Sequence, residues 1–369
     1  MEKIKHFCTF SGTGPVSFIK EFVKEKTNVE IETIGFSDID NNSLKFHKVN
    51  HPNIKAYGDI TKIDPYKLPD FDLFTGGFPC QSFSIAGKRE GFKAKDKGNL
   101  FFEIIRIISV KKPKYLLLEN VRGLTNHDSG ETLQVVVREL KKLGYGVAYK
   151  ILNSKNYGTP QNRERIWFAC KMGGWDFMEF HFPYSEYLKC NLYDLLESEK
   201  EIKNNYDNPD YFYLSEKQYK TALAYGLKKR GKDLTNNINK EVAACLTTGG
   251  DKRHLHDVNL VVHNLAPRTG DPGKGGTGHL SRDDGLSYCL DTSKTLFIES
   301  NSIKPRVLTP KERFRLMGFK DDSYSVKGIS YTGCNNLTGN GWDLNVAKKV
   351  LVEMFSHNTV NQEKEIEND

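Results

Sequence analysis

Hydrophobic and polar positions alternate with two different periods along the first 170 residues. Residues 4–9 alternate as a strand with one buried side does, and residues 16–26 follow with helical spacing. The run 115–118 is continuously apolar, which is typical of a strand buried on both faces of a sheet. The same reading predicts strands at 29–36, 145–152 and 166–170 and helices at 99–108 and 131–143. Strands that alternate with helices in this way predict an α/β fold with a doubly wound, mainly parallel sheet.

The periodicity is lost in the middle of the chain and returns near its end. From about residue 185 to residue 302 the sequence is rich in Asn, Asp, Gly, Tyr and Lys, which indicates long surface loops. Thr309 is a helix cap and Pro310 a helix start, and a last helix covers 344–355. We therefore expect a large domain at 1–184 and a smaller irregular domain at 185–304. A return segment that completes the large domain follows at 305–357, and a polar, disordered tail at 358–369.

Composition restricts the class of protein. A chain of 369 residues is long enough for one large and one small domain. No apolar run approaches the ~18 residues of a membrane span, and the first residues are typical of a strand and not of a secretory signal. The seven cysteines include no Cys-x-x-Cys pair, which argues against a disulfide framework and against a metal site. These features predict a protein of the reducing cytoplasm.

One cysteine stands where chemistry is expected. The stretch 71–84, FDLFTGGFPCQSFS, begins as an alternating strand, turns at Gly76-Gly77 and presents Cys80 just after Pro79. Loops at the carboxyl ends of strands in an open α/β sheet are where ligands bind. A lone cysteine is more often inert core filler than a nucleophile, so the position alone leaves both interpretations open.

Positive charge is concentrated directly after this cysteine. The net charge of the chain is +7, and residues 81–114 carry nine lysines and arginines against three acids. A basic loop punctuated by glycines and next to a reactive thiol fits a lid that closes on phosphates. A solvated charged loop is the alternative.

Other side chains with candidate chemistry follow the predicted strands. Gly12 and Gly14 lie between the first strand and the first helix, where the backbone can approach a ligand closely. Asp38, after the second strand, stands where an acid commonly bonds ribose hydroxyls, and Asp59 occupies a similar strand edge. Glu119 follows the buried strand at 115–118. A carboxylate there is costly unless it is hydrogen-bonded or protonated, so Glu119 is a candidate proton carrier.

Two arginines complete the candidate chemistry. Arg163 and Arg165 flank Glu164 at the start of a strand. Such an arrangement is usually a surface ion-pair network, but at a strand edge the guanidinium groups can also hold a phosphate or a base oxygen.

The order of these pieces resembles that of the DNA cytosine-5 methyltransferases of bacteria and phages. The resemblance covers residues 4 to about 183 and 305–355. It rests on Phe10-Ser11-Gly12-Thr13-Gly14, Phe78-Pro79-Cys80-Gln81, Glu119-Asn120-Val121, Gln161-Asn162-Arg163-Glu164-Arg165, Arg306-Val307-Leu308-Thr309-Pro310 and Gly339-Asn340. In that family the irregular middle region is the target-recognition domain, and the large domain is a Rossmann-like methyltransferase fold.

The resemblance implies a reaction and roles for the chemical residues. Cys80 would add to C6 of a cytosine flipped out of the DNA helix, so that C5 can take a methyl group from S-adenosylmethionine. Glu119 would protonate or hydrogen-bond N3. Arg165, together with Arg163, would hold the base and the carboxylate. The products would be 5-methylcytosine and S-adenosylhomocysteine.

The resemblance also implies a cofactor site, with two departures from the family pattern. The residues it assigns to S-adenosylmethionine are Phe10, Ser11, Gly12, Thr13, Gly14, Asp38, Ile39, Asp59, Ile60, Pro79, Leu100 and Asn340. The chain has Pro15 where the family usually has a second glycine. It has Gly341-Trp342 where the family has a small or branched pair. The departures affect the detailed cofactor contacts and leave the chemical residues in place.

The expected partner is double-stranded DNA, and neither a membrane nor a metal is expected. We expect a monomer in the cytoplasm of a bacterial or phage-infected cell, with a restriction endonuclease as a possible genetic partner. A related transfer RNA methyltransferase is the first alternative, although its nucleophile motif usually has a proline in place of Phe78 and its middle domain is smaller. A catalytically silent DNA-binding relative is the second, but it would be expected to lack Cys80 or Glu119, and the chain has both.

Overall fold

The computed structural model describes residues 1–79, 100–174, 180–217, 261–264, 280–290, 296–300 and 303–366. Cys80, the basic segment 81–98 and most of 218–279 lie outside the described residues. Expectations about them therefore stay predictions.

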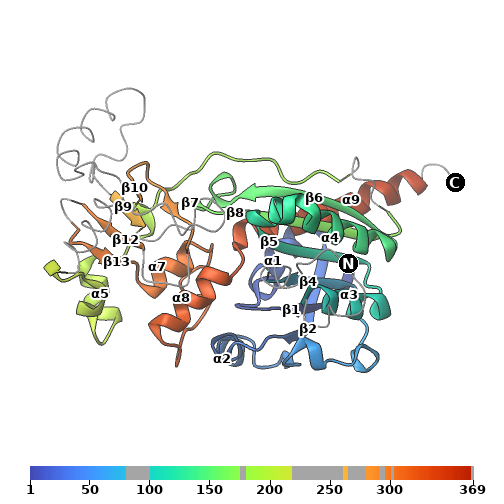
Figure 1. Cartoon of the computed structure of the whole chain (residues 1–369), viewed down its shortest axis with the longest axis horizontal. Coiled ribbons are helices and arrows are strands. Elements are labelled where there is room, and N and C mark those ends of the chain that lie inside the picture. Colours follow the sequence, from blue (N-terminus) through green and yellow to red (C-terminus); the bar gives the residue numbers. More distant parts are fainter. Residues whose placement is uncertain are drawn as a thin grey trace.

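A seven-stranded sheet forms the large part of the molecule (Figure 1). Its strand order is β3-β2-β1-β4-β5-β8-β6. Neighbouring strands from β3 to β5 are parallel, and β8 is antiparallel to both β5 and β6. The strands are β1 (Glu2–Thr9), β2 (Val29–Ser37), β3 (Lys55–Ala56), β4 (Leu73–Gly77), β5 (Tyr115–Val121), β6 (Tyr145–Asn153) and β8 (Glu164–Met172). The predicted mainly parallel α/β sheet is confirmed.

The central strand β5 shows why its sequence is continuously apolar. Tyr115 and Leu117 belong to one hydrophobic cluster, whereas Leu116 and Leu118 belong to another. The first cluster packs α1 (Pro15–Thr27) and α9 (Leu344–Ile366) on one face, and the second packs α3 (Leu100–Lys111) and α4 (Glu131–Lys142) on the other. Both faces of β5 are covered, so the strand positions whatever follows it rigidly.

The last helix is longer than its sequence pattern predicts. It continues to Ile366, through most of the segment 358–369 that we expected to be disordered. The segment contains neither proline nor glycine, and its glutamine, glutamates and lysine are good helix formers. No described helix is both long enough and apolar enough to cross a membrane.

A small antiparallel sheet joins the region that the sequence pattern describes as irregular to the start of the return segment. Its order is β10-β9-β12-β13, and it lies at the opposite end of the molecule from the large sheet (Figure 1). The strands are β9 (Val261–Asn264), β10 (Leu280–Arg282), β12 (Leu296–Glu299) and β13 (Arg306–Val307). The other α-helices of the described residues are α2 (Asn41–Asn50), α5 (Glu199–Asn205), α7 (Pro310–Arg315) and α8 (Tyr331–Asn340). Strand β7 (Gln161–Asn162) pairs with β11 (Ser287–Tyr288).

A buried ion pair fastens the return segment to the start of the middle region. Both guanidinium nitrogens of Arg306 donate to Glu312, at 2.8 and 2.6 Å, and both side chains are almost fully buried. Glu312 also accepts from the backbone N–H of Glu197 and of Thr309, at 2.8 Å each. The predicted cap at Thr309 is therefore confirmed as one half of a capping box.

Candidate active site

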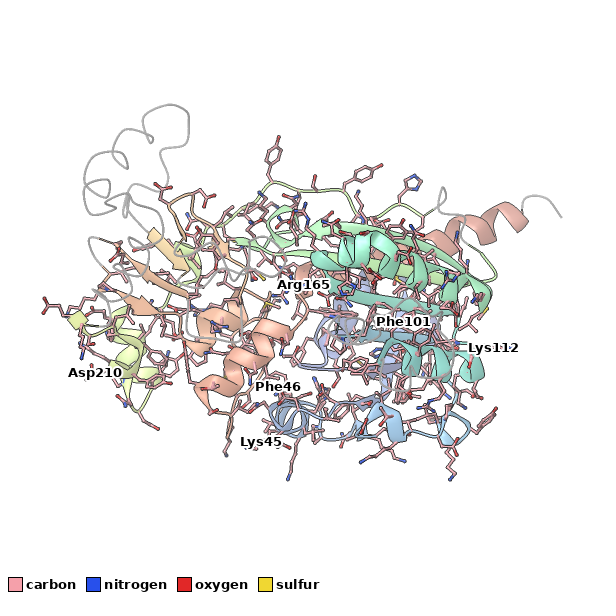
Figure 2. All side chains as sticks on the ribbon, viewed as in Figure 1. Lys45, Phe46, Phe101, Lys112, Arg165 and Asp210 are labelled. Carbon is pink, nitrogen blue, oxygen red and sulfur yellow. The ribbon has the colours of Figure 1, made fainter. Side chains whose placement is uncertain are left out.

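The register of the large sheet brings the candidate chemical residues to one edge. Gly77, at the carboxyl end of β4, pairs with Glu119 of β5. The turn predicted at Gly76-Gly77 is wrong, because both glycines belong to β4 and the strand continues to Gly77. Because β8 is antiparallel to β5, its first residues lie beside the last residues of β5, and Arg165 pairs with Val121. In Figure 2, Arg165 lies between the large sheet and the small one. Sequence positions 77, 119 and 165 therefore form one site.

Glu119 is a buried carboxyl group held by an ion pair. Its side chain is 8% exposed, and Arg165 Nε lies 2.9 Å from its Oε1 atom. Burial raises the pKa of Glu119 above its ordinary value of 4.5. The charges of Arg165 and Arg163 and hydrogen bonds from Arg165 and Trp342 oppose this rise without cancelling it. The carboxyl group therefore keeps its proton to higher pH than an exposed glutamate, as a proton donor must.

Arg163 makes contacts that differ from those of Arg165. It is 2% exposed and donates to the carbonyl oxygens of Gly339 and Gly341, at 3.2 and 2.6 Å. A third contact reaches the Leu290 carbonyl at 3.4 Å. Arg163 thus fastens the end of α8 to the large sheet, and it influences Glu119 through its charge.

Cys289 is a thiol at the site that the sequence pattern does not single out. Its Sγ lies 3.3 Å from Arg163 Nη1 and 3.6 Å from Arg165 Nη2. Burial raises the pKa of the thiol, but the charges of the two arginines outweigh burial and lower it. Cys8, by contrast, is a core thiol whose pKa burial raises to about 12. Among the described cysteines, Cys289 is therefore the one in an environment that favours a thiolate.

The chain that leads to Cys80 is anchored at the same edge. The Phe78 carbonyl accepts a hydrogen bond of 2.8 Å from Asn120 Nδ2, and the buried Phe78 ring packs against Phe101, with ring centroids 5.2 Å apart. Pro79 is exposed at the end of this segment. Asn120 is a positioning residue that the sequence presents only as part of a motif.

The backbone of the loop between β1 and α1 adopts left-handed conformations, which side chains other than glycine rarely allow. Phe10, Gly12 and Gly14 all have positive φ, at 52°, 52° and 65°. A phenylalanine in this region is strained, and such strain is concentrated at binding sites. Asp38 holds the loop, because its Oδ2 accepts from the Gly12 N–H and from Ser43 Oγ, both at 2.8 Å.

A narrow recess opens beside this loop. Phe10, Ser11, Gly12 and Asn340 of the candidate residues line it, together with Thr9, Gly76, Gly77 and Trp342. Thr9 is fully buried, and its Oγ1 has no partner among the described residues. An unsatisfied buried hydroxyl in the wall fits a ligand with polar groups.

The remaining candidate cofactor residues do not line the recess. Ile39 is 74% exposed, which leaves an apolar side chain open to a ligand ring. Asp59 accepts two hydrogen bonds from Thr61 and caps a short 3-10 helix, and Ile60 is buried.

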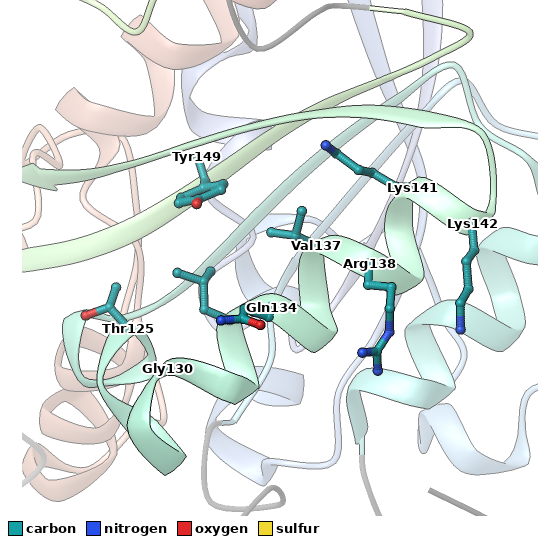
Figure 3. A pocket seen from close by; sticks show the side chains of 9 residues that line it. Thr125, Gly130, Gln134, Val137, Arg138, Lys141, Lys142 and Tyr149 are labelled. Carbon is teal, nitrogen blue, oxygen red and sulfur yellow. The ribbon is translucent and has the colours of Figure 1, made fainter. Parts of the chain in front are cut away.

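A separate groove of about 780 Å³ runs along α4 and β6 (Figure 3). Leu133, Val137 and Tyr149 are apolar members of its wall, and Arg138 and Lys141 are basic members. None of the candidate site residues lines it. In the described part of the chain, no group of three histidine, cysteine or acidic side chains is arranged to hold a metal ion.

Comparisons with known proteins identify the family and the fold. The family model described as C-5 cytosine-specific DNA methylase matches residues 10–356. The chain is 29% identical to the orphan methyltransferase M.SPRI of Bacillus phage SPR over 99% of the chain and 100% of that protein. It is 44% identical to the type II methyltransferase M.NgoBV of Neisseria gonorrhoeae over 46% of the chain.

The match covers 41% of the length of M.NgoBV, and less than half of several other curated relatives. Among solved structures, the Dnmt2 mutant of Spodoptera frugiperda has a TM-score of 0.64 at 17% identity. The match covers 95% of this chain and 99% of that one. At this level of identity the likeness concerns the fold.

Proposed function

The chain belongs to the C-5 cytosine-specific DNA methylase family, and from this membership we propose that it methylates C5 of cytosine in double-stranded DNA, using S-adenosylmethionine. The observation that carries the proposal is the Arg165–Glu119 pair, 2.9 Å apart. The pair lies beside the segment that leads to Cys80. It also lies beside the recess whose wall contains the Thr9 hydroxyl group, which has no hydrogen-bond partner among the described residues.

Cytosine C5 is a weak nucleophile, and the proposed chemistry overcomes this with a thiolate. The Cys80 thiolate forms a bond to C6, and the displaced electron pair of the C5–C6 double bond is delocalised toward N3, where Glu119 donates a proton. When bound, S-adenosylmethionine supplies the methyl group and leaves as S-adenosylhomocysteine. Loss of the C5 proton to water and breakage of the bond between sulfur and C6 re-form the C5–C6 double bond and the thiolate. The N3 proton returns to the Glu119 carboxylate, which restores the ring and the acid.

The two arginines have different tasks in this scheme. Arg165 fixes the carboxyl group of Glu119 and is close enough to the same edge to hold the base O2. Arg163 holds Gly339 and Gly341, and so it positions the wall of the cofactor recess. Its contribution to the reaction is therefore indirect.

The loop and its supports would hold the cofactor. The N-terminus of α1, with its partial positive charge, suits the carboxylate of the methionine part. Asp38 Oδ1 accepts one hydrogen bond from the Asp40 N–H and can accept another from a ribose hydroxyl. The exposed Ile39 suits a purine face. Asp59, Ile60, Pro79, Leu100 and Asn340 complete the proposed set.

The middle region, 185–304, would choose the cytosine. The residues assigned to the reaction, directly or as supports, lie at 80, 119, 163 and 165, all within 1–184. Specificity in DNA readout depends on side chains that reach base edges. The basic segment 81–98 would close on the flipped base and the phosphates. We place the protein in the cytoplasm of a bacterial or phage-infected cell, acting as a monomer.

The test is methyl transfer from radiolabelled S-adenosylmethionine to DNA, followed by bisulfite sequencing. We expect label in double-stranded DNA and protected cytosines within one short recurring sequence. Label in transfer RNA and none in DNA would instead assign the RNA activity. DNA binding without label in either would identify a silent relative.

A further inference from the structure

Trp342 occupies a place that the family pattern gives to a small or branched residue. It follows Gly341 at the end of α8 and is 6% exposed. Its ring packs edge-on against Trp167 of β8, with centroids 4.9 Å apart at 69°. Because Trp167 pairs with Glu119 across the sheet, the indole is held next to the candidate proton donor.

The same indole contacts both halves of the site. It lines the recess together with Phe10, Gly12 and Asn340. Its N–H also acts on the Glu119 carboxyl group as a hydrogen-bond donor does, because it lowers the pKa of that group. A Cβ atom at Gly77 would lie 2.9 Å from Trp342 Nε1 and 3.2 Å from Glu119 Oε2, so the two groups meet over the one position in β4 that has no side chain.

The donor chemistry decides what this contact can do. An indole N–H donates and never accepts, so it can only stabilise an oxygen of Glu119 that faces it. Arg165 Nε contacts Oε1. Trp342 Nε1 and Glu119 Oε2 lie on the other side, next to Gly77. Donation from the indole to this second oxygen would oppose a rotation of the carboxyl plane.

We propose that Trp342 is a positioning residue, which orients the Glu119 carboxyl group toward the base and forms the wall between it and the cofactor recess. The role rests on the proposed function. It also explains how the chain tolerates a large residue at a family position for small ones, since the absent side chain at Gly77 provides the space.

The pKa of Glu119 tests this role without turnover. The chain is labelled with carboxyl-¹³C glutamate, the Glu119 resonance is assigned with Glu119→Gln, and the resonance is titrated in wild type and in Trp342→Phe. The phenylalanine keeps a ring against Trp167 and removes the N–H. Since the indole donor lowers the pKa of Glu119, we expect the pKa to rise in Trp342→Phe. Trp167→Phe changes the packing partner of Trp342 and removes no donor to Glu119, so the pKa of Glu119 should stay unchanged.

Kinetics test the second half of the role. In Trp342→Phe we expect kcat to fall roughly tenfold, as for the loss of one hydrogen bond to a charged group. The alkaline decline of kcat should move to higher pH, and the Kd for S-adenosylhomocysteine should stay within about threefold. Trp342→Val also removes the ring that forms the wall of the recess, and it should raise the Kd for S-adenosylhomocysteine about tenfold.

The outcomes separate this role from the proposed function. An unchanged pKa of Glu119 and an unchanged pH profile in Trp342→Phe would overturn the positioning role while wild-type methylation stands. If wild type methylates nothing, the proposed function fails, and the titration still reports on the contact. Trp342→Tyr, which keeps an aromatic ring and displaces the donor, replaces Trp342→Phe if thermal unfolding shows that the latter is not folded.

Discussion

Arg165 Nε lies 2.9 Å from Glu119 Oε1 because β8 runs antiparallel to β5. The two residues are 46 positions apart in sequence, and the register places their side chains on the same face of the sheet as diagonal neighbours. A strand buried on both faces carries one partner, so the pair has little freedom to separate. Most of the proposed chemistry depends on this geometry.

Glu119→Gln should remove the proton donor. Burial raises the pKa of Glu119 above 4.5, so activity that needs the protonated carboxyl group is present below that raised pKa and declines as the pH rises through it. We expect kcat to fall by ~10²–10⁴ in the variant, and the alkaline decline that Glu119 causes to disappear. The measurement is kcat against pH for both proteins. A variant with the wild-type alkaline decline would show that another group titrates.

Arg165→Ala should move the alkaline decline of kcat to higher pH. The Arg165 charge lowers the pKa of Glu119, so its loss should raise that pKa and move the alkaline decline to higher pH. The orienting contact is lost too, and kcat should fall ~10–100-fold. Arg122→Ala is the matched control, because Arg122 makes an exposed ion pair with Glu164 on the neighbouring surface. Equal losses in both variants would contradict a specific role for Arg165.

Asp38→Ala should loosen the cofactor loop. Asp38 Oδ2 accepts from the Gly12 N–H and from Ser43 Oγ. Its removal should weaken the binding free energy of S-adenosylhomocysteine by ~1–3 kcal/mol, measured by calorimetry. Asp40→Ala is the control, since Asp40 caps α2 through the Asn42 N–H. It should cost ~1 kcal/mol of unfolding free energy and leave the dissociation constant unchanged. Unchanged binding in Asp38→Ala would mean that the ribose and the loop are held elsewhere.

Gly77→Ala should disturb the site through a single methyl group. The added Cβ would lie 2.9 Å from Trp342 Nε1, which is closer than side chains approach without a shift of one of them. We expect kcat to fall at least tenfold, with a cost of ~1–3 kcal/mol in unfolding free energy. Gly123→Ala, where a Cβ meets nothing within 4 Å, should be close to neutral. Full activity in Gly77→Ala would show that the indole and the carboxyl group do not need their observed places.

Local pattern was sufficient for the sheet and for Glu119. The run 115–118 is apolar because both faces of β5 are covered, and the residue after such a run must stand at the sheet edge. The cap at Thr309 follows from an equally local preference. These features could be predicted because their causes lie within a few residues of them.

Contacts between distant segments could not be predicted in the same way. Arg163 donates to the Gly339 and Gly341 carbonyls. Every residue has a backbone carbonyl, so the sequence does not indicate which ones accept a hydrogen bond from this arginine. Cys289 reaches the arginines because β11 pairs with β7. Each of these strands is two residues long, which is too short for a sequence pattern to predict the pairing. Trp342 is visible in the sequence as a departure from the family pattern, and only the fold shows that its indole and the Glu119 carboxyl group meet beside Gly77.

The most direct test of the central claim is to identify the cysteine that bonds to the base. DNA in which 5-fluorocytosine replaces cytosine should trap the enzyme, because fluorine at C5 cannot leave as the proton does and the bond from sulfur to C6 persists. Cys289 is the matched rival, since its thiol contacts both arginines and its pKa is lowered. We predict a trapped complex for wild type and for Cys289→Ser, none for Cys80→Ser, and a DNA adduct on Cys80 in peptide mapping. An adduct on Cys289, or a trapped complex that survives Cys80→Ser, would contradict the account.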